Sequence, residues 1–241
     1  MPTDLSHTTV GDIVARDLRT AAIFARHGID FCCGGHVALA DACRARNVDV
    51  ALLLEELSRV DTSEDAIDDT SLSIDALIDL IVSEHHAYVR RDTPVITALL
   101  EKVVMRHGQT YPEVHDVAQA FATLGGELYA HMEKEERVLF PYIAALASGE
   151  GTGRPGRPPF GTVRNPISLL QHDHAGAAML LDHIQRLTNR FTAPPDACTT
   201  FKACCTALEA FDRDLREHVH LENNVLFPAA LRLEDALSSL T

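Results

Sequence analysis

Apolar residues recur at helical spacing over four long stretches in the C-terminal two thirds of the chain. These stretches lie near residues 72–107, 113–147, 166–190 and 196–235. Apolar positions at i, i+3, i+4 and i+7 form one stripe along a helix, and none of the stretches shows the alternation of a strand. Gly108 ends the first stretch, and a loop rich in Gly and Pro at 148–166 separates the second from the third. Two helical hairpins joined by a long loop predict a four-helix bundle in an all-α protein.

The first sixty residues have a different pattern, with shorter apolar runs that are broken at closer intervals. Short helices are predicted there near residues 10–14, 21–27, 37–46 and 50–60. A polar, acidic stretch follows and has the composition of a linker. We therefore predict a small helical domain over residues 1–62, a linker over 63–71 and the bundle over 72–241.

Composition and net charge argue against some classes of binding partner. Of the 241 residues, 46% are apolar and 23% are charged, which is ordinary globular usage. The net charge of −14 disfavours polyanions, so we expect neither a nucleic acid nor a membrane surface as a partner. The first residues lack the layout of a signal peptide and no apolar run approaches about 18 residues, so we expect a cytoplasmic location. Six cysteines in such a chain do not indicate a disulfide scaffold.

One motif occurs twice in the predicted bundle. Both copies read H-x-x-x-E-x-x-V-L-F-P, beginning at His131 and at His218, 87 residues apart. Residues four apart share a helix face, so His131 points the same way as Glu135. His218 shares its face with Glu222 in the same manner, and both pairs fall in the middle of an apolar stripe. Two similar hairpins would relate the copies by a pseudo-two-fold axis.

An imidazole and a carboxylate on a core-facing stripe need an explanation. Burying an ionised carboxylate without a partner costs several kcal/mol. For a single motif, a hydrogen-bonded His–Glu pair would be the simpler interpretation. Two copies, both on core faces, favour a bound metal ion instead, because buried charges are either paired or coordinate metal.

The other two long helices offer further histidines at core positions. His174 lies on the apolar stripe of the third helix, whereas His172 points about 200° away from it. On the first helix His85 and His86 compete, and periodicity does not decide between them, although the spacing to the next motif leans towards His86. His107 follows His86 by 21 residues, about 31 Å along a continuous helix, so we expect it to lie outside the site.

Four imidazoles and two carboxylates suit two metal ions bridged by the carboxylates. This donor set is compatible with iron, manganese or zinc. The absence of cysteine from both motifs and the coordination positions left open favour iron. The predicted cofactor is therefore a pair of non-haem iron ions.

The segment 31–36, Phe-Cys-Cys-Gly-Gly-His, is a second candidate for chemistry. Its cysteines, Cys32 and Cys33, have two interpretations that the sequence leaves equal. They are either a reactive thiol pair, activated by a following helix N-terminus, or buried thiols in a tight turn. Neighbouring cysteines are too close for an unstrained disulfide. The other cysteines divide into expected core thiols and one undecided residue near a helix start: Cys43, Cys204 and Cys205, and Cys198.

On these residues the chain resembles the iron–sulfur cluster repair di-iron proteins, the RIC (repair of iron centres) family. The resemblance covers nearly the whole length and rests on residues 30–35, 131–141, 195–201 and 218–228. It implies a haemerythrin-like four-helix bundle that carries a non-haem di-iron centre, preceded by a small helical domain.

The resemblance also implies site residues by position. The implied metal ligands are His86, His131, Glu135, His174, His218 and Glu222, with the two glutamates as bridges. The family's first histidine matches without a gap, which favours this ligand over His85. On the third helix the family usually has Glu-His where this chain has Asp173-His174, and a His-Asp match would choose His172 instead. Glu127 and Asp173 fall where the family has acidic residues near the two ions.

The resemblance further implies a function. The family repairs iron–sulfur clusters damaged by nitrosative or oxidative stress, by donating iron, by handling NO at the di-iron centre, or by both. Cys32 and Cys33 would assist by thiol transfer. The expected partners are damaged iron–sulfur proteins, with NO or O₂ as a small ligand. This favours a repair protein over an enzyme.

Two alternatives and one further expectation accompany this reading. The first alternative is a protein that binds or senses NO or O₂ without repairing clusters. The second is a slow NO reductase that forms N₂O. The vicinal cysteines and the small N-terminal domain also suggest self-association, and we expect a homodimer.

Overall fold

The computed structural model of the protein describes residues 7–60, 69–148 and 158–239. Most of the predicted linker at 63–71 and much of the predicted loop at 148–166 lie outside the described residues. Within the described residues, no helix is both long and apolar enough to cross a membrane. Contacts divide the chain into two compact units, the first made of residues 1–79, 143–164 and 216–241 and the second of residues 80–142 and 165–215.

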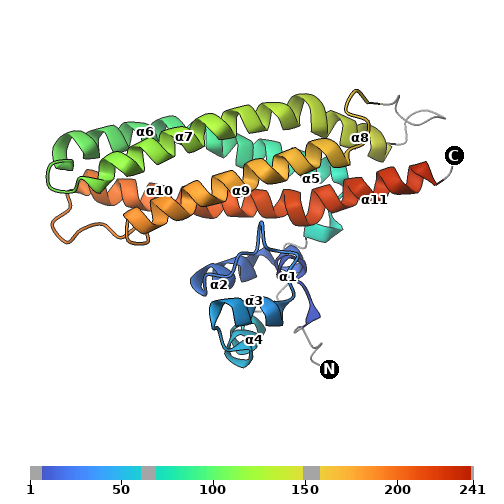
Figure 1. Cartoon of the computed structure of the whole chain (residues 1–241), viewed down its shortest axis with the longest axis horizontal. Coiled ribbons are helices and arrows are strands. Elements are labelled where there is room, and N and C mark those ends of the chain that lie inside the picture. Colours follow the sequence, from blue (N-terminus) through green and yellow to red (C-terminus); the bar gives the residue numbers. More distant parts are fainter. Residues whose placement is uncertain (1–6, 61–68, 149–157, 240–241) are drawn as a thin grey trace. The chain divides into compact units, whose positions relative to one another are not determined.

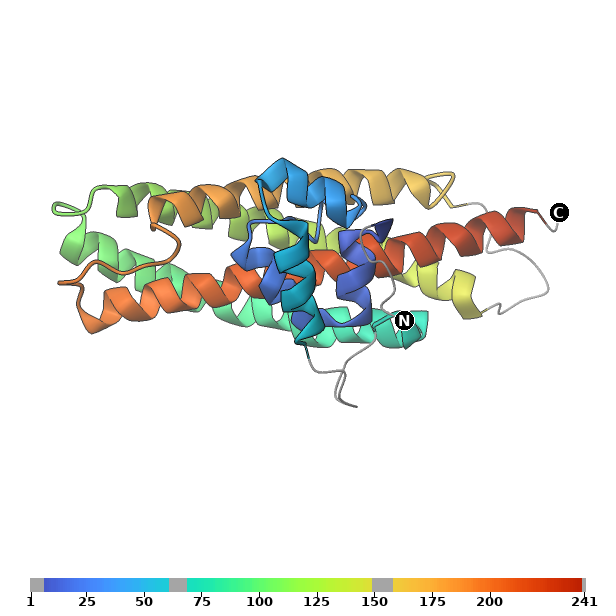
Figure 2. The ribbon, with the colours of Figure 1, turned by 90° about the horizontal axis from the view of Figure 1, so that it is seen from below.

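The second unit contains four long helices that lie side by side (Figures 1 and 2). They are α6 (Ala87–His107), α7 (Glu113–Lys134), α9 (Arg164–Leu187) and most of α10 (Thr199–His220). Their apolar faces share a core, in which Phe121 of α7 meets Phe211 of α10 edge-on with 5.2 Å between ring centroids. The four-helix bundle predicted from the apolar periodicity is confirmed.

Three of the four predicted long helices contain a π-helical segment that the sequence pattern did not indicate. The segments are η4 (Ile81–His86) between α5 (Ile74–Leu80) and α6, η5 (Glu135–Leu139) between α7 and α8 (Phe140–Ser148), and η6 (Leu221–Leu226) between α10 and α11 (Phe227–Ser238). Each segment contains one predicted metal ligand: His86 in η4, Glu135 in η5 and Glu222 in η6. Such segments are rare and occur mostly at functional sites.

A proline explains two of these segments. Pro141 and Pro228 have no N–H to give to the carbonyl group four residues earlier, and the ring crowds that carbonyl. Widening the preceding turn relieves the conflict. The N–H of Phe140 donates instead to the carbonyl of Glu135, five residues earlier. In the second copy of the motif the N–H of Phe227 donates to the carbonyl of Glu222 in the same way.

The first unit begins with short helices, as predicted. In order along the chain they are α1 (Val10–Arg16), the 3₁₀ turn η2 (Leu18–Thr20), α2 (Ala21–Arg26), α3 (Leu39–Arg46), α4 (Val50–Ser58) and the 3₁₀ turn η3 (Asp69–Ser71). Polar side chains cap three of them: Thr9 accepts a hydrogen bond at the start of α1, Asp17 at the start of η2 and Asp49 at the start of α4. Helix α3 begins two residues later than predicted because Ala38 is extended and forms a bridge with Thr9.

The di-cysteine segment is held tightly within this first unit. The side chain of Asn224 in η6 donates hydrogen bonds to the carbonyl oxygens of Cys32 at 2.9 Å and Phe31 at 3.3 Å. The N–H of Gly11 in α1 donates to the carbonyl of Gly35 at 2.7 Å. The turn therefore lies between α1 and η6, where there is no room for a side chain at Gly35.

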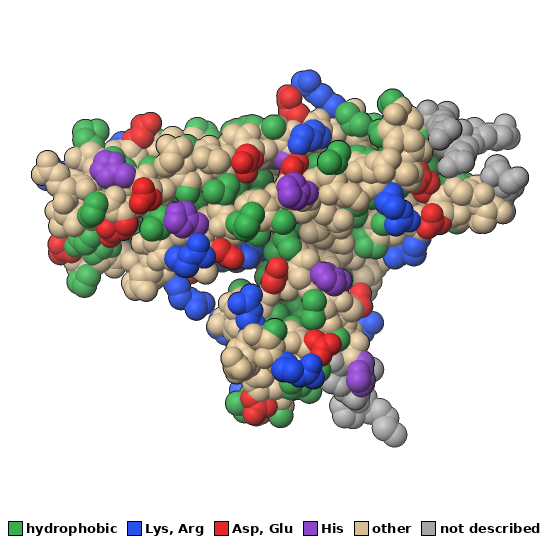
Figure 3. Space-filling model, viewed as in Figure 1, with side chains coloured by type: hydrophobic (Ala, Val, Ile, Leu, Met, Phe, Trp, Pro, Cys, Tyr) green, Lys and Arg blue, Asp and Glu red, His purple; other side chains and the backbone are tan. Residues whose placement is uncertain are grey.

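Charged side chains of both signs are interspersed on the face of the protein shown in Figure 3. Large apolar side chains that are exposed are spread over several helices, for example Met105 on α6 and Met179 on α9. Single exposed apolar residues are usual on a folded chain. This surface does not test the predicted homodimer, which stays a prediction. The predicted domain boundaries also stay predictions.

Two glycine-to-alanine substitutions test this packing. A Cβ atom at Gly35 would come within 2.6 Å of the Phe31 carbonyl oxygen and would overlap the side chain of Asn224. Gly35→Ala should therefore lower the free energy of unfolding by about 1–3 kcal/mol, as overpacking does. At Gly126 in α7 a Cβ would meet nothing within 4 Å. Gly126→Ala should raise stability by about 0.5–1 kcal/mol, because alanine favours a helix. Urea unfolding followed by circular dichroism measures both, and equal stability of Gly35→Ala and the wild type would contradict the docking described above.

Candidate metal centre

Glu135 is the central side chain of a buried cluster in the second unit. It is the first residue of η5 and is fully buried. Its Oε1 lies 3.2 Å from Nε2 of His131, and its Oε2 lies 3.4 Å from Nε2 of His86. Nε2 of His174 in turn lies 3.0 Å from Nε2 of His131. The carboxylate thus presents one oxygen to each of two imidazoles, and a third imidazole faces the same point.

A second set of carboxylates orients two of these imidazoles from behind. Nδ1 of His86 lies 2.6 Å from Oε1 of Glu136, which also accepts a hydrogen bond from Arg90 at 2.8 Å. Nδ1 of His131 lies 3.4 Å from Oδ2 of Asp173, to which Lys134 also donates. An imidazole that donates through Nδ1 to a carboxylate keeps the lone pair on Nε2. Both rings therefore present an acceptor nitrogen to Glu135.

The pKa values of these supporting carboxyl groups agree with that role. Partial burial of Glu136 and Asp173 tends to raise the pKa, but hydrogen bonds from the histidines and from Arg90 or Lys134 outweigh it. The pKa of each carboxyl group is consequently below its ordinary value. Both groups are ionised at neutral pH and can accept the proton on Nδ1.

The second copy of the motif has the same local geometry within the first unit. Nε2 of His218 lies 3.0 Å from Oε1 of Glu222, and both side chains are buried. The corresponding distance in the first copy is 3.2 Å. Each copy thus buries an imidazole and a carboxylate together, as the helical spacing predicts.

The residues of the second unit fit a metal ion. Within the described part of the chain, neither carboxylate oxygen of Glu135 has a hydrogen-bond partner. A fully buried carboxylate without hydrogen bonds is costly, and a cation beside it removes that cost. One ligand atom each from His131, Glu135 and His174 lies within 4.8 Å of the others, and the same holds for His86 and Glu135. Imidazole nitrogens with carboxylate oxygens form a donor set that iron accepts.

Comparison with known proteins agrees with this geometry. Residues 77–230 match the hemerythrin HHE cation binding domain, and residues 6–61 match ScdA_N, a domain of unknown function. A protein of Musicola paradisiaca (strain Ech703) called iron–sulfur cluster repair protein YtfE is 34% identical over 94% of this chain and 97% of its own length. A protein of the same name from Yersinia pestis (strain Pestoides F) is 33% identical over 96% of this chain and 100% of its own.

The chain belongs to the hemerythrin-type family of iron–sulfur cluster repair proteins. The resemblance deduced from the motifs is confirmed. The matched cation-binding domain includes all six predicted ligands, which agrees with a metal-binding function for the buried histidines and glutamates.

The structure places the competing histidines in different surroundings. His86 faces Glu135, whereas Nδ1 of the neighbouring His85 lies 3.1 Å from Asp214 of α10. His174 is buried and His172 is exposed. At the opposite end of α6 from the cluster, Nε2 of His107 lies 3.2 Å from the sulfur of Cys198. These positions agree with the expectation that His107 lies outside the site.

Asp173 and Glu127, the two acidic residues predicted to lie near the ions, have different surroundings in the structure. Asp173 lies beside His131, as expected of a residue near the site. Glu127 is exposed on α7 and, within the described residues, makes no hydrogen bond or ion pair. Sequence reasoning missed Glu136, which supports His86. A regular helix turns neighbouring residues about 100° apart, so the pattern gave no sign that Glu135 and Glu136 both reach one imidazole.

The structure separates the two cysteines of the N-terminal segment. Cys32 is buried, and its pKa is raised well above its ordinary value by the hydrogen bond with the Cys33 thiol and by burial. The backbone N–H groups of Cys32 and Cys33 both donate to Oδ1 of Asp30 at 3.0 Å. They stabilise that carboxylate rather than a thiolate, so for Cys32 the structure favours the second of the two interpretations, a buried thiol in a tight turn. Cys33 is half-buried.

Removing the support behind His86 should weaken metal binding. Glu136→Gln keeps the side-chain size but replaces a charged acceptor of the Nδ1 proton by a neutral one. Loss of such a partner typically costs 10–100-fold in metal affinity. Competition with a chromogenic chelator measures the affinity of the purified protein. Glu133→Gln is the matched control, because Glu133 is exposed on the same helix and pairs only with Arg137 among the described residues. Equal affinities of the two variants would contradict the role of Glu136.

Proposed function

We propose that this protein repairs iron–sulfur clusters damaged by nitrosative or oxidative stress and does so with two non-haem iron ions. The relatives that match almost the whole chain are called iron–sulfur cluster repair proteins. The observation that carries the proposal is the pair of oxygens of Glu135, which face two different imidazoles and lack hydrogen bonds within the described residues. A carboxylate in this position suits a bridge between two cations.

The proposed ligands come from both copies of the motif. They are His86, His131, Glu135, His174, His218 and Glu222, with Glu135 and Glu222 as bridges. Three lines support this set: the internal repeat, the equal His–Glu geometry in both copies, and a cation-binding domain match that includes all six.

The residues of the chain prepare this site in three ways. Glu136 and Asp173 hold the rings of His86 and His131 in the tautomer whose Nε2 accepts. Burial of the ligands keeps water away from the carboxylate. Bound iron would supply open positions for NO or O₂ and a source of ferrous iron for a damaged cluster. We assign Cys33, the less buried of the two vicinal thiols, as the group in Cys32–Cys33 that is placed to exchange with a client protein.

The proposed partners and location follow from this chemistry. Damaged iron–sulfur proteins are the proposed clients, with NO or O₂ as a small ligand. We propose a cytoplasmic location, which agrees with six cysteines that are all free.

Metal analysis tests the ligand set. The wild-type protein, purified without air and reconstituted with ferrous iron, should hold two iron ions per chain, as carboxylate-bridged helical bundles do. The double variant Glu135→Ala, Glu222→Ala should hold little or none, because both bridges are lost. The matched control Glu133→Ala, Glu209→Ala removes two exposed carboxylates from the same two helices. An equal iron content in all three proteins would contradict the assignment.

A cluster-repair assay tests the function itself. An iron–sulfur dehydratase inactivated by NO should recover activity faster with the iron-loaded protein than with the same amount of free ferrous iron. The double variant that lacks both bridging glutamates should give no gain over free iron. A protein that binds NO yet gives no gain would be a gas-binding protein, and formation of N₂O without recovery would indicate an NO reductase. Either result would overturn the repair function.

A further inference from the structure

Cys198 and His107 form a thiol–imidazole pair at the end of the bundle where α6 ends and α10 begins. The sulfur of Cys198 lies 3.2 Å from Nε2 of His107, the last residue of α6. Cys198 is exposed and directly precedes α10. The ring of His107 packs against Phe201 in the first turn of α10, with 5.4 Å between ring centroids. The imidazole is therefore fixed in position beside an accessible thiol.

The surroundings of this thiol favour its anion. Backbone N–H groups of Phe201 and Thr200 at the start of α10 hydrogen-bond the sulfur, and His107 adds a further hydrogen bond. Together they lower the pKa of Cys198 to about 7. Two further titratable groups near His107 hydrogen-bond each other, since the hydroxyl of Tyr111 donates to the carboxylate of Asp196. That hydrogen bond lowers the pKa of Asp196 and occupies one of its oxygens.

Four other cysteines have a pKa that is raised rather than lowered. Burial raises the pKa of Cys204 to about 12, and it raises the pKa of Cys205 and Cys43 as well. The pKa of Cys32 is also raised, by its hydrogen bond with Cys33 and by burial. A thiol attacks a disulfide fastest when its pKa is close to the ambient pH. Among these cysteines, Cys198 alone meets that condition at neutral pH.

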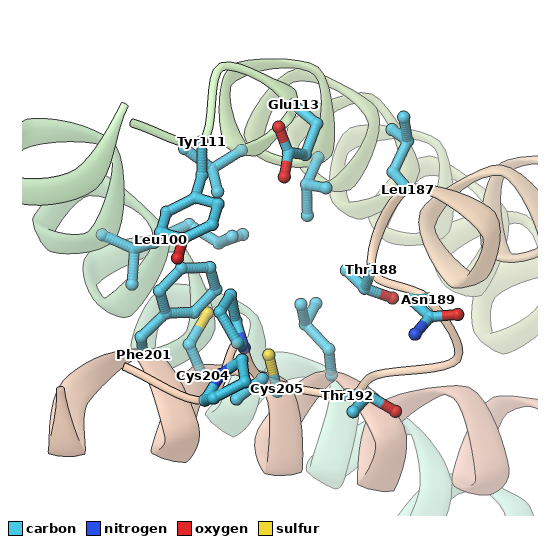
Figure 4. Close-up of a pocket in the computed structure, with 17 residues that line it drawn as sticks. Leu100, Tyr111, Glu113, Leu187, Thr188, Asn189, Thr192, Phe201, Cys204 and Cys205 are labelled. Atoms are coloured by element: carbon cyan, nitrogen blue, oxygen red, sulfur yellow. The ribbon is translucent and has the colours of Figure 1, made fainter. Parts of the chain in front are cut away.

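A cavity of about 390 Å³ in the second unit adjoins this pair through shared residues. Phe201, which packs on His107, and Tyr111, which packs on Phe201, both line it. Figure 4 shows their rings together on one side of the space, with Thr188 and Asn189 on the other. The cavity has mainly apolar walls with a few polar side chains, and it shares Phe201 with the thiol–imidazole pair, which suits the organic part of a small ligand.

The geometry points to Cys198 as a thiol-exchange site that forms a mixed disulfide with a small disulfide, with His107 as the base. Nε2 of His107 takes the thiol proton, and the Cys198 sulfur attacks one sulfur atom of the disulfide R–S–S–R. A new sulfur–sulfur bond forms as the original one breaks, and the released thiolate R–S⁻ takes the proton from His107. One disulfide is consumed and one mixed disulfide and one thiol are formed.

Site-resolved kinetics of the full-length protein test this proposal. The protein is incubated with oxidised glutathione, and the modified peptides are quantified by mass spectrometry over time. Cys198 should be modified faster than the other five cysteines. The rate of its alkylation by iodoacetamide should rise with pH through an apparent pKa of about 7.

Two variants distinguish the effect of the His107 imidazole on the pKa of Cys198 from the effect of the N–H groups at the start of α10. His107→Gln keeps a polar side chain of similar length but cannot take the proton, so the apparent pKa of Cys198 should rise and its exchange rate at neutral pH should fall about twofold or more. His115→Gln, which alters another exposed histidine at the start of α7, should leave both values unchanged. Circular dichroism checks that both variants are folded. Faster modification of Cys33 than of Cys198, or an unchanged pH profile in His107→Gln, would overturn the proposal.

Discussion

The buried carboxylate of Glu135 is the constraint on which the candidate centre depends. A carboxylate that is fully removed from water is tolerated only beside opposite charge. Here each of its oxygens faces an imidazole nitrogen rather than a hydrogen-bond donor in good geometry. The rings are themselves held by ionised carboxyl groups on their far side. The cluster consequently concentrates acceptor atoms around one point, and a cation is the group that would balance them.

The π-helical segments put this chemistry where regular helices would not. They occur at His86, at Glu135 and at Glu222, and in the two copies of the motif a proline ten residues after the histidine accounts for them. The extra residue in the turn changes which neighbours face inwards. It allows Glu136 to reach His86 from behind while Glu135 reaches it from the front. Backbone irregularity and ligand geometry therefore have the same origin in the sequence.

The two copies of the motif have diverged in what surrounds the His–Glu pair. In the first copy, the residue after the buried glutamate, Glu136, supports an imidazole of the cluster. In the second copy, Asn224, the second residue after the buried glutamate, binds the carbonyl oxygens of the di-cysteine turn. One repeat thus stabilises the candidate metal site, and the other fastens the N-terminal thiols to the segment that carries Glu222. The candidate metal site and the contacts to the di-cysteine turn are in this way built on the same backbone motif.

The sequence by itself determined the helices, the bundle, the motif repeat and the burial of both His–Glu pairs, because these follow from spacing along a single helix. It left His85 and His86 unresolved, gave no sign of Glu136 and did not decide between the two interpretations of Cys32. Only the tertiary structure distinguished them. Which imidazole meets Glu135, and that His107 reaches Cys198, depend on segments far apart in the chain. The Asp30 oxygen that binds the N–H groups of Cys32 and Cys33 is only two and three residues away, but the spacing of apolar residues carries no sign of this turn. Periodicity describes the face of one helix, whereas a site is made by the atoms that several elements bring to one place.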